Sequence, residues 1–348
     1  METIKLTKYS HGSGCGCKIA PQALETILRS DMPQWSDPKL LVGNNTRDDA
    51  AVYDLGNNMA LINTVDFFMP IVDDAFDFGR IASANAISDV YAMGGKPLLA
   101  TAILGWPVDK LPAELAQRVL DGARTICAEA GIPLAGGHSI DSLEPMFGLC
   151  VNGLVPITGI KKNAGAKAGD YIYITKPLGI GILSTAQKRD VLKPEHLGVF
   201  IQQLTQLNAI GEKFGQLNYV HAMTDITGFG LLGHLVEMCE GAGVSAEIDY
   251  PAVPLIEGIQ SYIAAMIIPD NTYRNWNSYE KKIQGIGMES LYTLCDPQTN
   301  GGLMVAVSPE HKSEFESFLA DHQLSAFATP VARILEKQDY AVQILKAR

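Results

Sequence analysis

The sequence has 348 residues, of which 47% are hydrophobic and 19% charged, with a formal net charge of −11. These values are typical of a globular chain of about two domains, at roughly 150 residues each. The negative charge disfavours nucleic acid, the longest apolar run (Pro97–Leu104) is too short to cross a membrane, and six scattered cysteines do not indicate a secreted disulfide scaffold. We therefore expect a cytoplasmic protein that contacts neither nucleic acid nor membranes.

The first half of the chain predicts an α/β domain behind a mobile, glycine-rich head. Pro21 begins a short predicted helix, since proline is tolerated at the first helical position. The helix predicted over 78–93 ends at Gly94-Gly95 and turns Asp89 toward small side chains, where something other than packing could fill the space. The other elements predicted here are strands over 51–55, 59–65, 98–104 and 147–155 and near 134, and a helix over 112–130.

The second half predicts another α/β domain. The polar segment Lys161–Gly169 is the predicted linker, so that the two domains cover residues 1–160 and 161–348. The predicted strands are 171–175, 244–248 and 303–307, and the predicted helices are 195–214, 231–240 and 309–322.

The head, His11–Lys18, reads HGSGCGCK and places a lysine beside Cys15 and Cys17. A neighbouring cation favours the thiolate, which is the nucleophilic form of cysteine, and Lys18 could also contact a phosphate. The alternatives are a flexible terminus with incidental cysteines and a zinc site. The zinc site is the weaker alternative, because Cys-Gly-Cys offers two ligands where structural zinc takes four.

Three acidic segments could hold Mg²⁺, which prefers oxygen ligands and often binds through carboxylates and substrate phosphates. Asp48 and Asp49 follow Thr46 and Arg47 and, like Asp66, are expected at strand ends. A solvated turn is the alternative for this segment. The other two candidates are Asp89 and Asp225, and Asp225 could instead be a helix N-cap.

Three further loops are polar or rich in glycine. Gly136–Ser139 ends a short apolar strand and could hydrogen-bond a nucleotide, or could be a tight turn. Gly179–Gly181 is a weak candidate for a phosphate cradle, and Asp296–Gly302 indicates only a turn. Familiar ATP-site motifs of the P-loop and protein-kinase kinds are absent.

Taken in order, these motifs resemble those of the selenophosphate synthetases, a family of selenide, water dikinases. The segments that carry the resemblance are Gly14–Lys18, Thr46–Val52, Thr64–Phe68, Asn85–Asp89, Ala135–Ser139, Thr224–Gly230 and Asp296–Thr299. The resemblance covers nearly the whole chain. It implies an α/β (α+β), two-lobed fold of the aminoimidazole ribonucleotide synthetase type, and a homodimer formed through the sheets of the N-terminal lobes.

The resemblance also implies an activity: ATP, selenide and water give selenophosphate, AMP and orthophosphate. More than one Mg²⁺ is expected, as is transient contact with a selenium-delivery protein. Cys15 and Lys18 match catalytic positions, with Cys17 less critical, and the head is expected to close over ATP. The implied metal ligands are Asp49, Asp89 and Asp225, and the implied nucleotide contacts are Lys18, Thr46, Arg47, Asp48, Asp66, Asp89, Gly137, His138 and Ser139.

Other readings remain at this point. A thiamine monophosphate kinase-like or aminoimidazole ribonucleotide synthetase-like enzyme would lack the Gly-Cys-Gly-Cys-Lys head. A thiol protein that only carries selenium or metal would not need the aspartates. One departure from the family pattern is Asn300, where serine is more frequent, and it leaves the role of that loop open.

Overall fold

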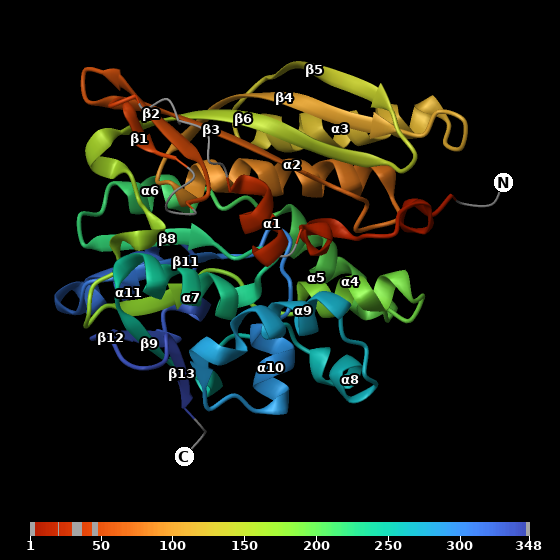
Figure 1. Cartoon of the computed structure of the whole chain (residues 1–348). Helices are drawn as coiled ribbons and strands as arrows, with labels where there is room; N and C mark the ends of the chain where they lie inside the picture. Colours follow the sequence, from red (N-terminus) through yellow and green to blue (C-terminus); the bar gives the residue numbers. More distant parts are fainter. Residues whose placement is uncertain (1–3, 20, 30–36, 44–47, 346–348) are drawn as a thin grey trace.

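The computed structural model describes residues 4–19, 21–29, 37–43 and 48–345 and contains two β-sheets with helices packed around them (Figure 1). Within these residues, no helix is both long and apolar enough to span a membrane. The predicted Thr46 and Arg47 contacts lie outside the described residues.

The first sheet has six described strands in the order β1-β2-β3-β6-β4-β5. β4 and β5 are parallel, whereas the other neighbours are antiparallel. The strands predicted over 51–55 and 59–65 are confirmed as β2 and β3, which pair as an antiparallel hairpin. The strands are β1 (Leu40–Val42), β2 (Ala51–Gly56), β3 (Met59–Phe68), β4 (Lys96–Trp106), β5 (Leu134–Asp141) and β6 (Met146–Pro156).

Helix α2 (Ala75–Ala92) is the structural centre of the molecule. It packs on β3 and β6 and on α3 (Ala113–Glu129), and it also contacts the second half of the chain (Figure 1). Fifteen of its 18 residues are buried, and many are small, which lets neighbouring backbones approach closely. A Cβ at Gly79 would lie 1.8 Å from the carbonyl oxygen of Val119. Because most of α2 is buried, Asn85, Ser88 and Asp89 on it face other elements rather than water.

The second sheet has seven described strands in the order β10-β13-β9-β12-β7-β11-β8. Its strands are β7 (Tyr171–Ile174), β8 (Val220–Asp225), β9 (Ser245–Asp249), β10 (Ile283–Gln284), β11 (Leu303–Val307), β12 (Ala332–Leu335) and β13 (Val342–Leu345). The helices of this half are α4 (Ile180–Lys188), α5 (Pro194–Thr205), α6 (Ile210–Gly215), α7 (Gly230–Ala242), α8 (Ile259–Ala264), α9 (Asp270–Tyr279), α10 (Met288–Leu294) and α11 (Lys312–Asp321).

Two sequence predictions need correction. Asp66 lies inside β3 rather than at a strand end, because β3 runs on to Phe68. The helix predicted over 195–214 is two helices, α5 and α6. The predicted linker Lys161–Gly169 is packed against the second half of the chain, where the Lys161 ammonium donates to the carbonyls of Leu217 and Val220, each at 2.8 Å.

The head also differs from the mobile segment that the sequence predicts. It forms two short 3₁₀ turns, Leu6–Tyr9 and Gly14–Cys17, followed by α1 (Pro21–Leu28). The N–H of Gly14 donates to the Met69 carbonyl at 3.1 Å. The head is therefore held against the body of the protein in this structure.

The loop Asp296–Gly302 joins the two halves through Asn300, whose backbone N–H donates to Oδ1 of Asn85 on α2 at 2.8 Å. The Asn300 side chain donates to the carbonyls of Leu204 and Gln206 at 2.8 and 2.9 Å, which ends α5, and its backbone has a left-handed φ of 47°. A serine hydroxyl has one donor and could not make both bonds. The departure from the family pattern thus has a structural role.

We predict that Asn300→Ala and Asn300→Gly both destabilise the protein, by about 1–3 kcal/mol for the lost hydrogen bonds. Alanine should cost about 1 kcal/mol more than glycine, because only glycine adopts a positive φ without strain. Urea unfolding of the two variants beside the wild type measures both effects. Equal stability of all three proteins would contradict the structural role.

Candidate active site

Four aspartates from distant parts of the chain gather where the two sheets meet. Asp49 precedes β2, Asp66 lies in β3, Asp89 lies near the end of α2, and Asp225 ends β8. The negative charges of Asp225, Asp66 and Asp49 all raise the pKa of Asp89. The structure therefore brings together Asp49, Asp89 and Asp225, the predicted metal ligands, and Asp66, a predicted nucleotide contact.

A hydroxyl group orients each of the three predicted metal ligands. Thr64 donates to Asp89 at 2.6 Å and Thr224 donates to Asp49 at 2.8 Å. Ser88 donates to Asp225 at 2.5 Å and itself accepts a hydrogen bond from Asn208 at 2.8 Å. Asp225 is thus not a helix N-cap, since its carboxylate is committed to Ser88 on α2.

Burial raises the pKa of all three of these carboxyl groups. The pKa of Asp49 and that of Asp89 are raised well above their usual range, by burial first and then by the charge of Asp225. Burial raises the pKa of Asp225 to about 6, against the opposing effects of the Ser88 hydrogen bond and the Lys18 charge. Ionised together, these groups repel one another, and a bound cation would relieve that repulsion.

The arrangement fits a divalent cation that also binds phosphate. Oδ2 of Asp49 is buried and has no hydrogen-bond partner among the described residues. Within the described ranges, no three His, Cys, Asp or Glu side chains enclose a metal ion by themselves. Magnesium commonly takes one or two carboxylates and completes its shell with water and substrate phosphates. Asp49, Asp89 and Asp225 can serve as such ligands.

Lys18 faces this acidic group from the head. Its ammonium lies 3.4 Å from Oδ2 of Asp66. Burial would lower the pKa of Lys18, but the negative charges around it, led by that of Asp66, raise the pKa well above its usual value. Lys18 therefore stays cationic beside the carboxylates, where it could also contact a phosphate.

Cys15 is fully buried rather than exposed on a mobile head. Its thiol donates to Oδ1 of Asn85 at 3.2 Å, and its backbone N–H donates to the Thr299 hydroxyl at 2.9 Å. The Asn85 amide group donates in turn to Asp66 at 2.6 Å. Asn85 therefore connects the thiol to the carboxylate that binds Lys18.

The segment Thr224–Gly230 reaches the site as a turn between β8 and α7. The backbone N–H of Thr227 donates to Nε2 of His234 at 3.1 Å, so this histidine must be neutral to accept it. Burial, together with the charge of Lys18, lowers the pKa of His234 to about 3. A Cβ at Gly228 would lie 2.8 Å from the Cys15 carbonyl oxygen, which shows how closely the head approaches this turn.

Asp48 lies next to this group: its charge raises the pKa of Asp49, and its side chain accepts from the backbone N–H of Asn163 at 2.6 Å. Three other predicted residues lie apart from the group. Gly137, His138 and Ser139 are exposed on β5, three strands from Asp66 on β3, which is roughly 14 Å at the usual strand spacing. Within one chain, these three residues are not brought to the carboxylates.

The candidate phosphate cradle at Gly179–Gly181 is closed. The first amides of α4 are capped by the loop that follows α10: Gly181 donates to Asp296 at 3.0 Å, and Ile180 donates to Gln298 at 3.3 Å. Because Asp296 and Gln298 already accept from these amides, the amides are not available to a phosphate. The loop that the sequence identifies only as a turn thus positions α4 and, through Thr299, Cys15.

The family models match both halves of the chain. The AIR synthase related protein N-terminal domain matches residues 47–155, and the AIR synthase related protein C-terminal domain matches residues 167–345. A selenide, water dikinase of Aeromonas hydrophila is 56% identical over 93% of this chain and 94% of its own. One of Pasteurella multocida is 54% identical, over 97% and 95%. This chain belongs to the selenide, water dikinase family.

Solved structures support the fold of this selenide, water dikinase family member. A thiamine-monophosphate kinase from Stenotrophomonas maltophilia aligns with a TM-score of 0.65 at 18% identity, over 92% of this chain and 93% of its own. The hydrogenase maturation protein HypE, in complex with ATP, aligns with a TM-score of 0.64 at 19% identity, over 86% and 82%. The predicted two-lobed, aminoimidazole ribonucleotide synthetase-like fold is confirmed.

Sequence reasoning missed the residues that orient the site of this dikinase family member. Asn85, Ser88 and Thr64 lie within recognised motifs, but no role was assigned to them. Asn208 and Thr299 reach the site from loops. The sequence signal that could have found the first three is a polar residue on the apolar side of a buried helix or strand, since such a residue requires a partner.

We predict that His234→Gln removes an acid sensitivity of folding. A pKa lowered in the folded state means that the unfolded state binds a proton first as the pH falls below about 6.5. Wild-type stability should therefore fall by about 1.4 kcal/mol per pH unit more steeply than that of the variant between pH 6 and 4. Urea unfolding at each pH, with His138→Gln as a surface control, tests this; parallel profiles of wild type and His234→Gln would contradict it.

We also predict that Asp225→Asn stabilises the metal-free protein at alkaline pH. A carboxyl pKa raised in the folded state makes stability fall as the pH rises through about 6, and asparagine abolishes that loss. At pH 8 in EDTA the gain should be about 2 kcal/mol, vanishing near pH 4. Chemical unfolding measures it, with the exposed Asp321→Asn as the matched control. A variant less stable than wild type at pH 8 would refute the repulsion.

Proposed function

We propose that this chain is a selenide, water dikinase that converts ATP, selenide and water into selenophosphate, AMP and orthophosphate. The observation that carries the proposal is the meeting of Lys18, the buried aspartates and Cys15 where the two sheets adjoin. The reaction needs each of these chemistries: cations near the phosphates, carboxylates for the metal, and a group able to handle selenium.

In this proposal Asp49, Asp89 and Asp225 hold Mg²⁺ ions that bind the ATP phosphates and screen their charge. The raised pKa of each carboxyl group supports this role, because a cation would favour ionisation of all three. Thr64, Ser88 and Thr224 fix the carboxylate orientations before the substrate arrives. Preorganised ligands of this kind lower the reorganisation required during phosphoryl transfer.

Lys18 then stabilises the negative charge on the γ-phosphate as selenide attacks it. Asp66 holds the ammonium in place, and Asn85 sets the Cys15 thiol beside the same carboxylate. Cys15 positions the selenium species. Hydrolysis of the remaining ADP gives AMP and the second phosphate. Thr46, Arg47 and Asp48 complete the nucleotide contacts in the proposal.

A homodimer also belongs to this proposal. The face of the first sheet that points away from α2 exposes apolar side chains. In the proposal, residues 1–160 form the domain that binds ATP, and this exposed face of its sheet forms the dimer interface. Exposed apolar patches of this kind often mark interfaces. The side chains are Val65, Phe67, Leu98 and Ile140, between 46% and 56% exposed.

A second copy facing this sheet could supply the contacts of Gly137, His138 and Ser139, which one chain keeps away from Asp66. We also propose a cytoplasmic location and transient contact with a selenium-delivery protein. The absence of disulfides among the described cysteines supports a reducing compartment.

The proposal is tested by anaerobic incubation of the protein with ATP and Mg²⁺, with and without selenide, followed by ³¹P NMR. We expect selenide-dependent selenophosphate with equal AMP and orthophosphate. Cys15→Ser should lower the rate at least tenfold, because an alcohol replaces the thiol, whereas the matched Cys150→Ser should not. ADP accumulation without selenophosphate would indicate a different ATP-using enzyme.

A further inference from the structure

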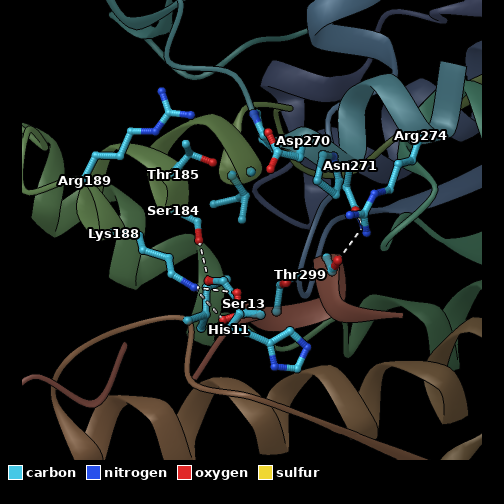
Figure 2. A pocket seen from close by; sticks show the side chains of 17 residues that line it. His11, Ser13, Ser184, Thr185, Lys188, Arg189, Asp270, Asn271, Arg274 and Thr299 are labelled. Carbon is cyan, nitrogen blue, oxygen red and sulfur yellow. Dashed lines mark hydrogen bonds between the residues drawn. The ribbon is translucent and has the colours of Figure 1, made fainter. Parts of the chain in front are cut away.

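A polar pocket of about 330 Å³ lies between the head, α4 and α9. Figure 2 shows side chains of α4, among them Ser184, Lys188 and Arg189, across the pocket from those of α9, among them Asp270 and Arg274. Gly12, Ser13 and Gly16 of the head and Thr299 also line it. The head thus separates this pocket from the aspartates.

The pocket is cationic in a chain whose net charge is −11. Lys188, Arg189 and Arg274 line it against one carboxylate, Asp270. Within the described part of the chain, no Phe, Tyr or Trp lines it, and His11 supplies the one aromatic ring among its lining residues. These features favour a small anion over a nucleotide.

Lys188 is committed to holding the head. Its ammonium donates to the carbonyls of Ser10, His11 and Gly12 at 3.2, 2.9 and 3.0 Å (Figure 2). The two guanidinium groups make only long contacts within the described residues, Arg189 to the Met266 carbonyl and Arg274 to Asn271, both at 3.4 Å. A guanidinium has five N–H donors, so both can still bind an anion.

The pocket adjoins the reactive part of the head. Asn271 and Arg274 also line a second, smaller cavity together with Lys18 and Gly228. The Asn271 side chain, which lines both cavities, donates a hydrogen bond to the Gly16 carbonyl at 2.5 Å. A Cβ at Gly16 would meet nothing closer than 3.8 Å, so packing alone does not require glycine there. The pocket and the cavity beside Lys18 therefore share Asn271 and Arg274 as common walls.

We propose that this pocket binds selenide, as the hydrogen selenide anion, through Arg189 and Arg274 before it reaches Lys18. The inference rests on the proposed function, and it adds a binding site for selenide, the second substrate. It places selenide and ATP on opposite sides of the head. The anion can then arrive without crossing the carboxylates, which would repel it.

The test is steady-state kinetics under anaerobic conditions, with selenide varied at saturating Mg-ATP and then ATP varied at saturating selenide. Arg274→Gln should raise the KM for selenide about tenfold, since a charge-assisted contact is lost. The KM for ATP and the kcat at saturating selenide should stay within twofold. Arg274→Lys should restore part of the affinity, and Arg189→Gln should act in the same direction as Arg274→Gln.

Arg124→Gln is the matched control, because Arg124 is exposed on α3 and paired with Asp121. Arg189 and Arg274 are also exposed, and thermal unfolding verifies that each variant folds. An unchanged KM for selenide in Arg189→Gln/Arg274→Gln would overturn the inference. The inference would also be overturned if the double variant lost only its inhibition by added orthophosphate, because the pocket would then bind the orthophosphate product rather than selenide. A wild type that makes no selenophosphate would instead contradict the proposed function.

Discussion

The structure depends on keeping several buried carboxylates close together at the junction of two sheets. Isolated buried charges are strongly disfavoured, so such a group persists only where hydrogen bonds and cations offset the repulsion. Here hydroxyl groups bind one oxygen of each predicted metal ligand, and Lys18 supplies a positive charge from the head. The remaining repulsion is what a metal-bound triphosphate would remove. The repulsion among the carboxylates, which destabilises the protein without ligand, would thus favour binding of the metal-bound nucleotide.

Helix α2 makes this arrangement possible. It carries Asn85, Ser88 and Asp89 on a segment that is enclosed by both halves of the chain. The three side chains reach different partners: the Cys15 thiol, Asp225 and Thr64. Helix α2 therefore sets the relative positions of the Cys15 thiol, of Asp66, which pairs with Lys18, and of the two predicted metal ligands Asp89 and Asp225. Sites supported by regular elements hold such geometry better than sites built on loops alone.

The sequence predicted those parts of the fold that local patterns determine. The segments 51–55 and 59–65 were predicted as strands and form β2 and β3, and Gly94 marked the end of α2. Asp89 was recognised because it lies among small residues, and ordered motifs identified Asp49 and Asp225. These patterns involve residues close together in the sequence, so they can be recognised without knowledge of the tertiary contacts.

The remainder depends on partners that are far apart in sequence. The apolar spacing continues from α5 into α6, and only the tertiary bonds of Asn300 to the carbonyls of Leu204 and Gln206 explain the break. The role of Ser88 follows from a residue 137 positions away. The burial of Cys15 likewise follows from the distant Thr299, so the glycines of the head suggested mobility where the structure shows a packed segment.

The central claim is that the aspartates bind the nucleotide only together with magnesium. The most direct measurement is isothermal titration calorimetry with the β,γ-methylene analogue of ATP, performed in excess Mg²⁺ and again in EDTA. The account predicts that removing Mg²⁺ weakens binding at least 100-fold, because the carboxylates would then face an unscreened triphosphate. Equal affinity in the two buffers would contradict it.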